Sequence, residues 1–414
     1  ALLSLSQLII IRTNNKFMKQ NKYLAVITIL VAVFVFVGAV SAKTSVDKGD
    51  IHKRVIAHTE EETDKAISLG CKVVREAKTL KALRCPQGVA ESLSLAEDVR
   101  VFALEEDEEV GISSRSRVGA TSASANQQIG ANLVHNSGNT GGGRKVAVLD
   151  TGYNYLHPEL SSSYLGGKDF VNDDNDPMDD EGHGSHVAGI ITADGIDPKA
   201  KGVAPDAGVI AGKVLDETGS GYFSDVVAGI YWVTDGPDGI TGTGDEFGAD
   251  AINLSLGTGA PYVYRGFCDG VLPDLTNAIK YAIQKNVTVA VAAGNSGRSG
   301  VSIPGCISYS TAVGAVNSSD KVASFSGRGN SLDITAPGVN IYSAVLGSLY
   351  ATWSGTSMAT PMVTGVIALV KNAHPEYTHS QTESKLFSTA KDLGKAGKDK
   401  DYGWGRVRAD KAVQ

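Results

Sequence analysis

The fold of this 414-residue chain is decided by a short apolar run, Lys145-Val-Ala-Val-Leu149, which ends at Asp150. Three later runs, 208–214, 251–254 and 287–292, are likewise rich in Val, Ile or Ala and bounded by Gly, Asp or Asn. Runs of this kind are typical of buried parallel strands. Helical stretches lie between and after them, at 186–193, 224–233, 275–285 and 360–373. Strands that alternate with helices predict an α/β fold, a doubly wound and mostly parallel sheet flanked by helices.

A smaller domain precedes this sheet. Residues 43–113 are charged and lack the glycine density of the later sequence. Two helices and three strands, two of them around a turn near Lys78, predict a small α+β domain. In that hairpin Cys71 and Cys85 lie opposite one another, a register that would allow a disulfide. An acidic run and a Ser-rich stretch then lead into the sheet-forming domain, which we place at 114–414.

The N-terminal residues have the pattern of a targeting signal. Met18 is followed by a short positive region, an apolar run over 24–37 and small residues that end at Ala42. This order is typical of a secretory signal peptide, at 18–42, whereas a transmembrane anchor would need about 20 apolar residues. We expect residues 1–17 to be an upstream, unstructured extension of the reading frame. We therefore expect a secreted, extracellular protein that meets the membrane only through its transient signal peptide.

Composition and motif searches exclude several classes of protein. With 38 basic and 45 acidic residues the chain has a net charge of −7, and it has no long basic run, so we expect no nucleic-acid partner. The four cysteines lack the paired C-x-x-C spacing of a zinc site. No G-x-x-x-x-G-K-[ST] occurs, which excludes a P-loop enzyme. The D-T-G at 150–152 occurs once, whereas a single-chain aspartic protease needs two such loops.

Three segments place a carboxylate, an imidazole and a hydroxyl at strand or helix ends of the same predicted sheet. They are 150–152 (D-T-G), 182–189 (G-H-G-S-H-V-A-G) and 355–361 (G-T-S-M-A-T-P). Taken alone, each segment is weak evidence for catalysis, because an Asp can cap a turn, a His can be structural and a Ser can cap a helix. Together they supply the nucleophile, the base and the orienting carboxylate of acyl transfer. We expect Pro361 in the first turn of its helix, where its missing N–H costs no helical bond.

The order of these motifs closely resembles that of the subtilisin-like serine proteases, the subtilases. The resemblance implies a secreted serine endopeptidase that forms an acyl-enzyme on Ser357. It implies that Asp150 completes the triad and that His183, rather than His186, is the base. It also implies that Asn295, in the segment A-A-G-N-S-G, supplies the side-chain donor of the oxyanion hole. The alternative, a binding protein on an inactive protease scaffold, would have lost one of these residues, and none is lost.

The resemblance extends over roughly 127–414 and also locates the segments that bind the polypeptide substrate. One resembles the wall of the pocket for the residue before the scissile bond, and the other an edge along which an extended substrate adds as a strand. The wall is Ser255, Leu256 and Gly257, and the edge is Gly219, Ser220 and Gly221. Because Ser296, directly after the oxyanion residue, is not an acid, nothing in the sequence favours a basic residue in that pocket. We expect the enzyme to be a monomer.

Residues 43–113 resemble the inhibitory propeptide of the family, which assists folding and is then cut away by the enzyme. The likeness is strongest at 80–84 and 104–107. The spacing of the family puts the cut near Ser113. We therefore expect a self-processing precursor whose own propeptide is an intramolecular inhibitor.

The acidic run 168–180 resembles a calcium loop that precedes the catalytic His in some subtilases, and several oxygens on one flexible loop suit a hard cation. We expect a structural calcium ion there. The ligands implied are Asp169, Asp174, the backbone carbonyls of Asp176 and Met178, and Asn172. A second calcium loop of the family would fall at 194–200, but Ile196 occupies a key amide position, so we expect no ion there.

Two departures from the family pattern lie near the substrate side. Residues 234–248 are an apparent polar, Gly-rich insertion, which we expect to be a surface loop. Cys268 lies in another lengthened segment, and Cys306 lies in the loop after Asn295. In an exported protein such cysteines can stay oxidised, and we expect these two to pair.

Overall fold

The computed structural model describes residues 52–104 and 122–414. The expected upstream extension, the signal peptide and the cut near Ser113 lie outside these residues. All described residues except His52 and Lys53 belong to one compact unit, Arg54–Gln414. Among the described residues no helix combines the length and apolar character needed to cross a membrane.

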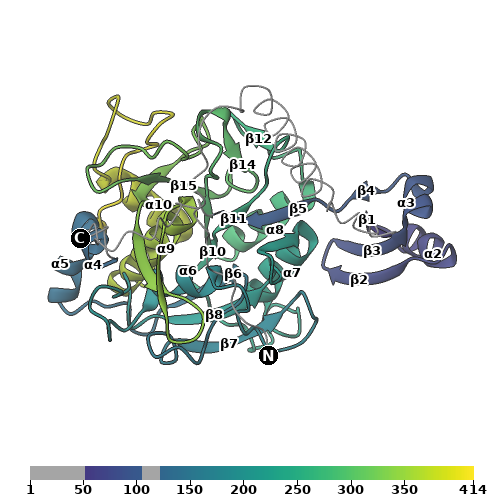
Figure 1. Cartoon of the computed structure of the whole chain (residues 1–414), viewed down its shortest axis with the longest axis horizontal. Helices are drawn as coiled ribbons and strands as arrows, with labels where there is room; N and C mark the ends of the chain where they lie inside the picture. Colours follow the sequence, from purple (N-terminus) through teal and green to yellow (C-terminus); the bar gives the residue numbers. More distant parts are fainter. Residues whose placement is uncertain (1–51, 105–121) are drawn as a thin grey trace, which may run out of the picture. The chain divides into compact units, whose positions relative to one another are not determined.

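A seven-stranded parallel sheet forms the centre of this unit (Figure 1). Its strands are β6 (Lys145–Asp150), β7 (Tyr164–Asp169), β8 (Gly208–Lys213), β10 (Ala251–Leu254), β13 (Thr288–Ala292), β15 (Thr311–Val316) and β16 (Ile334–Pro337). The order across the sheet is β16-β15-β13-β10-β6-β8-β7, and every pair of neighbours is parallel. The predicted parallel α/β fold is confirmed.

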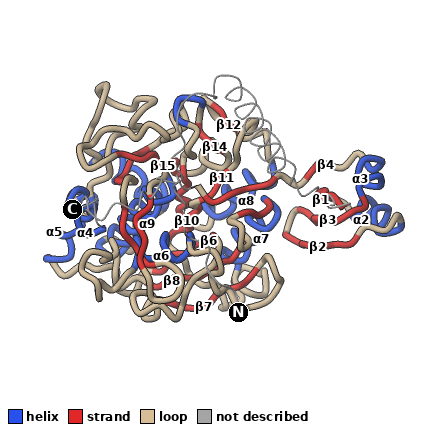
Figure 2. The backbone as a smooth tube through the Cα atoms, in the orientation of Figure 1, coloured by secondary structure: helices blue, strands red, loops and turns tan. Residues whose placement is uncertain are grey.

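Helices cover both faces of this sheet (Figure 2). One face carries α6 (His183–Thr192) and α9 (Thr356–Ala373), and the other carries α7 (Phe223–Asp235) and α8 (Pro273–Gln284). Alternate residues of β6 enter the two cores: Val146 and Val148 pack with α6 and α9, while Ala147 and Leu149 pack with α7 and α8. Because successive strand side chains point to opposite faces, a strand buried on both sides needs a continuous apolar run.

Shorter elements complete this domain. The helices are α4 (Ser122–Ile129), α5 (Ala131–Asn136), α10 (His379–Thr389), α11 (Ala409–Ala412) and the 3-10 turn η1 (Gly297–Ser299). The strands are β9 (Ser220–Tyr222), β11 (Leu256–Gly257), β12 (Val263–Tyr264), β14 (Val301–Ser302), β17 (Ile341–Ala344) and β18 (Tyr350–Trp353). The insertion begins in the last turn of α7, and its residues 237–245 are exposed, as expected of a surface loop.

The predicted position of Pro361 is wrong. Helix α9 begins at Thr356, four residues before the predicted start, so Pro361 is its sixth residue and lies beyond the first turn. At that position a proline removes the helical hydrogen bond to the carbonyl four residues earlier, which belongs to Ser357. The carbonyl of Ser357 accepts instead from Ser255 Oγ, at 2.9 Å.

The N-terminal described segment has the expected α+β elements. Its elements are β1 (His52–Ala57), α2 (Glu60–Ser68), β2 (Lys72–Ala77), β3 (Leu80–Pro86), α3 (Gln87–Leu93) and β4 (Ala96–Glu97). The strands form a sheet in the order β2-β3-β1-β4, with a small hydrophobic core of its own. The expected disulfide joins Cys71 to Cys85, with Cα atoms 4.2 Å apart, and both cysteines lie in this core.

One strand of this segment leaves its own sheet. β5 (Arg100–Ala103) lies between β9 and β11 and is antiparallel to both. Residues 52–104 therefore supply the central strand of a three-stranded sheet whose two outer strands belong to the larger domain.

Candidate active site

Asp150 and His183 meet at the carboxyl end of the central sheet. Asp150 is the last residue of β6, and His183 is the first residue of α6. His183 Nδ1 lies 2.7 Å from Asp150 Oδ1, and both side chains are fully buried. The backbone N–H of Thr151 donates to the same oxygen at 2.8 Å. Because an ionised carboxylate only accepts hydrogen bonds, this contact places a proton on Nδ1 of the imidazole.

His186, one turn further along α6, is held in a structural role. Its Nε2 lies 3.1 Å from the carbonyl of Ile341 and 3.2 Å from that of Ala351, and its ring stacks on Trp353 at 4.5 Å. Burial lowers the pKa of His186 to about 3, and the nearby His183 contributes to the same shift. An imidazole that stays neutral and donates to backbone carbonyls is unsuited to proton transfer. The geometry thus favours His183 over His186 as a base.

Ser357 is the second residue of α9 and is fully buried. Its Oγ donates to the carbonyl of Ser255 at 2.8 Å, and Ser255 Oγ donates to the carbonyl of Ser357 at 2.9 Å. Ser255 Oγ in turn accepts from Asn253 Nδ2, and Asn253 Oδ1 accepts from Thr364 Oγ1. A chain of side-chain hydrogen bonds therefore ties the end of β10 to two turns of α9.

Asn295 follows β13 and faces the start of α9. Its Oδ1 accepts from the backbone N–H of Thr356 at 3.1 Å and from Thr356 Oγ1 at 2.9 Å. Its Nδ2 is buried and has no hydrogen-bond partner among the described residues. A fixed acceptor and an unused donor on one amide are what an oxyanion-hole side chain requires.

Five of the six residues expected to bind substrate flank β5, and the sixth, Ser255, directly precedes β11. In the register of this sheet Phe102 is opposite Ser220 and Gly257, and Ala103 is opposite Leu256. The backbone N–H of Ala103 also donates to the carbonyl of Gly219 at 2.9 Å. A Cβ added to Gly257 would lie 2.9 Å from Leu104 Cδ1 and 3.0 Å from the carbonyl of Ile303. Glycine at 257 therefore allows Leu104 and the backbone at Ile303 to approach closely.

The expected calcium loop is held largely by its own hydrogen bonds. Asp169 is 2% exposed, and its carboxylate accepts from the backbone N–H groups of Val171 and Asn172 and from Asn172 Nδ2. The backbones of Asp169 and Asp174 bond to each other in both directions. The carboxylates of Asp174 and Asp176 each accept one backbone N–H two residues further on, that of Asp176 and of Met178.

The oxygen donors of this loop fit the chemistry of a hard cation. Among the described residues, however, no group of three His, Cys, Asp or Glu side chains converges on a metal position. Several of these oxygens already accept hydrogen bonds within the loop. The neighbouring Asp173 pairs with Arg75 at 2.9 Å, and this hydrogen bond lowers the pKa of its carboxyl group.

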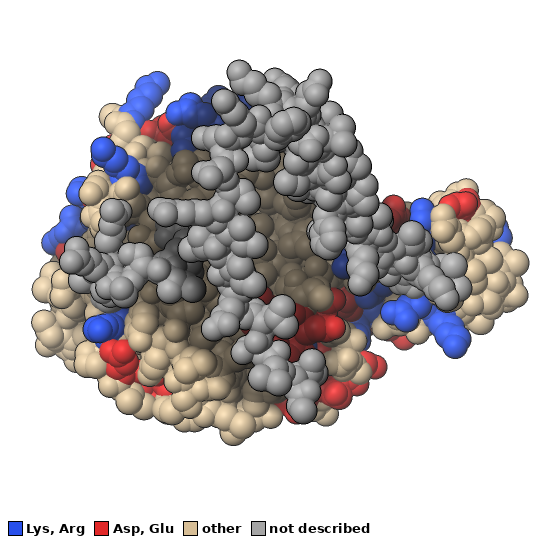
Figure 3. Space-filling view, in the orientation of Figure 1, with Lys and Arg blue, Asp and Glu red and all other residues tan. Residues whose placement is uncertain are grey.

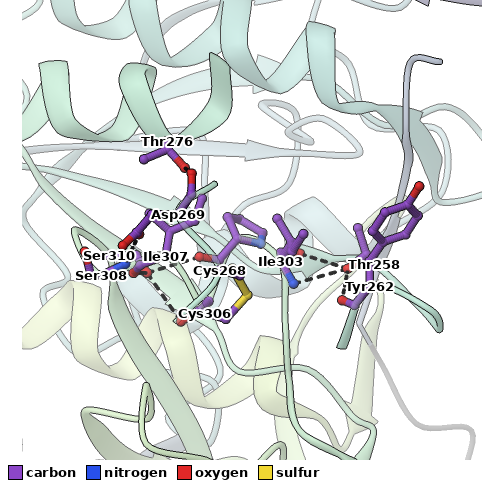
Figure 4. The surroundings of a disulfide bond; sticks show 12 residues. Thr258, Tyr262, Cys268, Asp269, Thr276, Ile303, Cys306, Ile307, Ser308 and Ser310 are labelled. Carbon is purple, nitrogen blue, oxygen red and sulfur yellow. Dashed lines mark hydrogen bonds between the residues drawn. A yellow bond between two sulfur atoms is a disulfide. The ribbon is translucent and has the colours of Figure 1, made fainter. Parts of the chain in front are cut away.

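The second expected disulfide joins Cys268 to Cys306 (Figure 4). The two Cα atoms are 5.4 Å apart, and the backbone N–H of Cys268 donates to the carbonyl of Cys306 at 3.0 Å. The bridge ties the segment that precedes α8 to the loop that follows Asn295.

Sequence reasoning missed the part played by Thr356. Its backbone N–H and its hydroxyl hold Asn295, and its Oγ1 also accepts from the backbone N–H of Gly294 at 3.1 Å. The only sequence signal for this role was its place between Gly355 and Ser357 in the motif, where a hydroxyl is typical of a helix start.

Comparisons with known proteins agree with this geometry. The Subtilase family profile matches residues 141–405. Subtilisin E of Bacillus subtilis (strain 168) is 40% identical over 294 residues, which cover 69% of this chain and 70% of that protein. M-protease of Shouchella clausii (strain KSM-K16) is 37% identical over 359 residues, which cover 87% of this chain and 85% of that protein. The chain belongs to the subtilase family and is a subtilisin-like serine endopeptidase.

Proposed function

We propose that this endopeptidase cuts polypeptides through an acyl-enzyme on Ser357, with Asp150 and His183 completing the triad. The observation that carries the assignment is the buried 2.7 Å contact between Asp150 and His183. It holds the imidazole with Nδ1 protonated, so that Nε2 is the atom that takes the proton from Ser357 Oγ as this oxygen attacks the substrate carbonyl. The carboxylate also stabilises the imidazolium that forms.

In this proposal Asn295 Nδ2 and the backbone N–H of Ser357 stabilise the oxyanion. The N–H groups in the first turn of a helix have no intrahelical partner, and the positive end of the α9 dipole favours negative charge there. Asn295 is aimed by its two hydrogen bonds to Thr356 before the reaction begins. Such preorganisation stabilises the transition state without a rearrangement during the reaction.

We further propose that an extended substrate binds between β9 and β11, where β5 lies. Support comes from the antiparallel pairing of β5 with both strands, which is the way a peptide adds to sheet edges. On this proposal residues 43–113 are an inhibitory propeptide that blocks its own enzyme until it is cut near Ser113. The signal-peptide pattern at 18–42 supports export, and we propose that the mature enzyme is an extracellular monomer.

The loop from Asp169 to Met178 is proposed to bind a structural calcium ion. Support comes from its concentration of carboxylate, amide and carbonyl oxygens and from the backbone pairing that sets Asp169 opposite Asp174. When bound, the ion would screen the mutual repulsion of the loop carboxylates.

The test is Ser357→Ala in the full-length chain. We expect no peptide hydrolysis and no maturation, because without the hydroxyl no acyl-enzyme forms. Ser384→Ala, an exposed serine on α10, is the matched control and should behave as wild type. The readouts are cleavage of a peptide panel that differs in the residue before the scissile bond and the mass of the purified chain. Normal processing of pure Ser357→Ala would contradict self-cleavage.

A further inference from the structure

A basic pocket lies next to the segment that carries Asn295. Its volume is about 210 Å³, and its lining residues are Arg265, Arg298, Arg328, Gly329, Lys400 and Asp401. Since a water molecule takes up about 30 Å³, the pocket has room for a small polyatomic ion. Four of its six lining residues are cations and one is an acid.

The positive charge of this pocket is mostly unneutralised. Asp401 pairs with Arg328 at 3.5 Å. Arg265, Arg298 and Lys400 form no ion pair with any described residue, and all three are exposed. Four cations and one carboxylate leave three positive charges, in a chain whose net charge is −7. Figure 3 shows that Lys and Arg side chains are unevenly spread over the drawn face, with several gathered along its upper left margin.

Arg328 is the buried part of the pocket. Its side chain is only 10% exposed; Nη1 faces Asp401, and Nη2 donates to the carbonyl of Ala323 at 3.0 Å. Its Nε is buried and has no hydrogen-bond partner in the described part of the chain. A buried, unsatisfied donor of a charged group costs free energy, and an anion in the pocket would supply the negative charge that Arg265, Arg298 and Lys400 lack.

Backbone hydrogen bonds join the chain segments that carry these cations. The N–H of Gly329 donates to the carbonyl of Lys400 at 3.1 Å, and the N–H of Asn330 donates to the carbonyl of Arg265 at 2.9 Å. The segment of Arg298 is joined to that of Arg328, since the N–H of Gly297 donates to the carbonyl of Phe325 at 2.6 Å. Segments distant in the sequence are thus fixed around one cavity.

We propose that this pocket is an anion site that binds a single oxyanion group: a carboxylate, a phosphate or a sulfate. Guanidinium groups match the paired oxygens of such groups and form charge-assisted hydrogen bonds with them. The site is separate from Asp150, His183 and Ser357. It lies close to Asn295 along the chain, since Arg298 is the third residue after Asn295, and the N–H of Gly327 donates to the carbonyl of Gly294 at 2.7 Å.

The test measures the unfolding temperature of the full-length Ser357→Ala chain, in which autolysis is absent, against sodium sulfate and sodium phosphate. Sodium chloride keeps the ionic strength constant. We expect sulfate or phosphate to raise the unfolding temperature saturably, beyond the effect of chloride. Replacing both Arg298→Gln and Lys400→Gln, two exposed cations, should weaken the apparent affinity by about tenfold or more. The matched control, Lys285→Gln with Lys321→Gln, makes the same charge change at exposed sites outside the pocket and should leave it unchanged.

A second arm separates the two sources of the oxyanion. N-acetylglutamate and its uncharged glutamine analogue are titrated in the same way. A saturable response to N-acetylglutamate alone assigns the site to carboxylates of polypeptides, and a response to sulfate or phosphate alone assigns it to inorganic anions. The proposal is overturned if none of these anions gives a saturable response beyond chloride, or if the pocket variant and the control variant respond alike.

Discussion

Ser255 and Ser357 hydrogen-bond to each other in both directions. Ser357 Oγ donates to the carbonyl of Ser255 at 2.8 Å, and Ser255 Oγ donates to the carbonyl of Ser357 at 2.9 Å. Pro361, four residues further along α9, has no N–H to donate to the carbonyl of Ser357, so the Ser255 hydroxyl takes the place of the helical donor. The proposed nucleophile is thereby tied to the proposed wall of the substrate pocket.

Ser255→Ala is expected to lower the free energy of unfolding by about 1–3 kcal/mol, because it leaves the buried carbonyl of Ser357 without a donor. The matched test adds Pro361→Ala, whose backbone N–H can donate to that carbonyl. Urea unfolding of the inactive Ser357→Ala background should show that the second change recovers part of the loss. If Ser255→Ala lowers the free energy of unfolding equally with and without Pro361→Ala, the Ser255 hydroxyl does not replace the N–H that Pro361 lacks.

Asn295→Asp and Asn295→Leu should both lower kcat while KM changes little, because each removes the Nδ2 donor proposed for the oxyanion. Removing one such donor costs about 10²–10³ in kcat, a figure measured on an enzyme of this family that we carry over. Asn295→Asp keeps an oxygen for Thr356 to bond, so its folded structure is the better preserved of the two. Steady-state kinetics on one peptide, with unfolding temperatures beside them, are the measurement. An unchanged kcat in both variants would remove Asn295 from the mechanism.

Calcium is expected to stabilise the mature enzyme through Asp169 and Asp174. At a free concentration 100 times the dissociation constant, an ion that binds only the folded loop raises the free energy of unfolding by about 2.7 kcal/mol. Asp174→Ala should lose most of this gain, whereas Asp238→Ala, an exposed carboxylate in the insertion, should keep it. Thermal inactivation with calcium and with excess chelator gives the comparison. If the insertion variant loses the calcium effect and Asp174→Ala retains it, the ion sits in the insertion.

Asp98 is expected to make the stability of the full-length chain depend on pH. Burial raises the pKa of its carboxyl group to about 6, against the attraction of Arg54 and with a small contribution from Asp225. Because the folded-state pKa is raised, the contribution of Asp98 is full below about pH 4 and is lost as the pH rises through about 6. Two pKa units correspond to roughly 2–3 kcal/mol.

Asp98→Asn cannot ionise and should therefore gain stability relative to Asp98 as the pH rises over that range. Urea unfolding of both forms in the Ser357→Ala background gives the difference at each pH. If the free energies of unfolding of the two forms change in parallel with pH, burial does not raise the pKa of Asp98.

The sequence predicted the elements that are buried on both sides, because such strands must be continuously apolar. Four strands of the central sheet could be recognised in this way. The flanking helices were predicted from the stretches between and after them, the Cys71–Cys85 pair from a hairpin register, and the Cys268–Cys306 pair from the expectation of export. β7 could not be recognised, since it is an edge strand that contains two glycines and is half exposed, and β16 has only four residues and ends in proline. β15, a six-residue buried run, has the same apolar character as the recognised strands and could have been predicted from the sequence.

Local pattern and family resemblance also indicated which residues of the site to examine, because motif residues keep their spacing along the chain. Only the tertiary structure decided which groups meet. Ser255 and Ser357 are 102 positions apart, and their reciprocal bonds depend on α9 starting at Thr356 and on Pro361 lying in its second turn. The predicted first-turn position failed because a helix start is decided by what the N-terminal N–H and C=O groups meet in the fold. The insertion of β5 between β9 and β11 is likewise a pairing of distant edges, which no periodicity along the chain encodes.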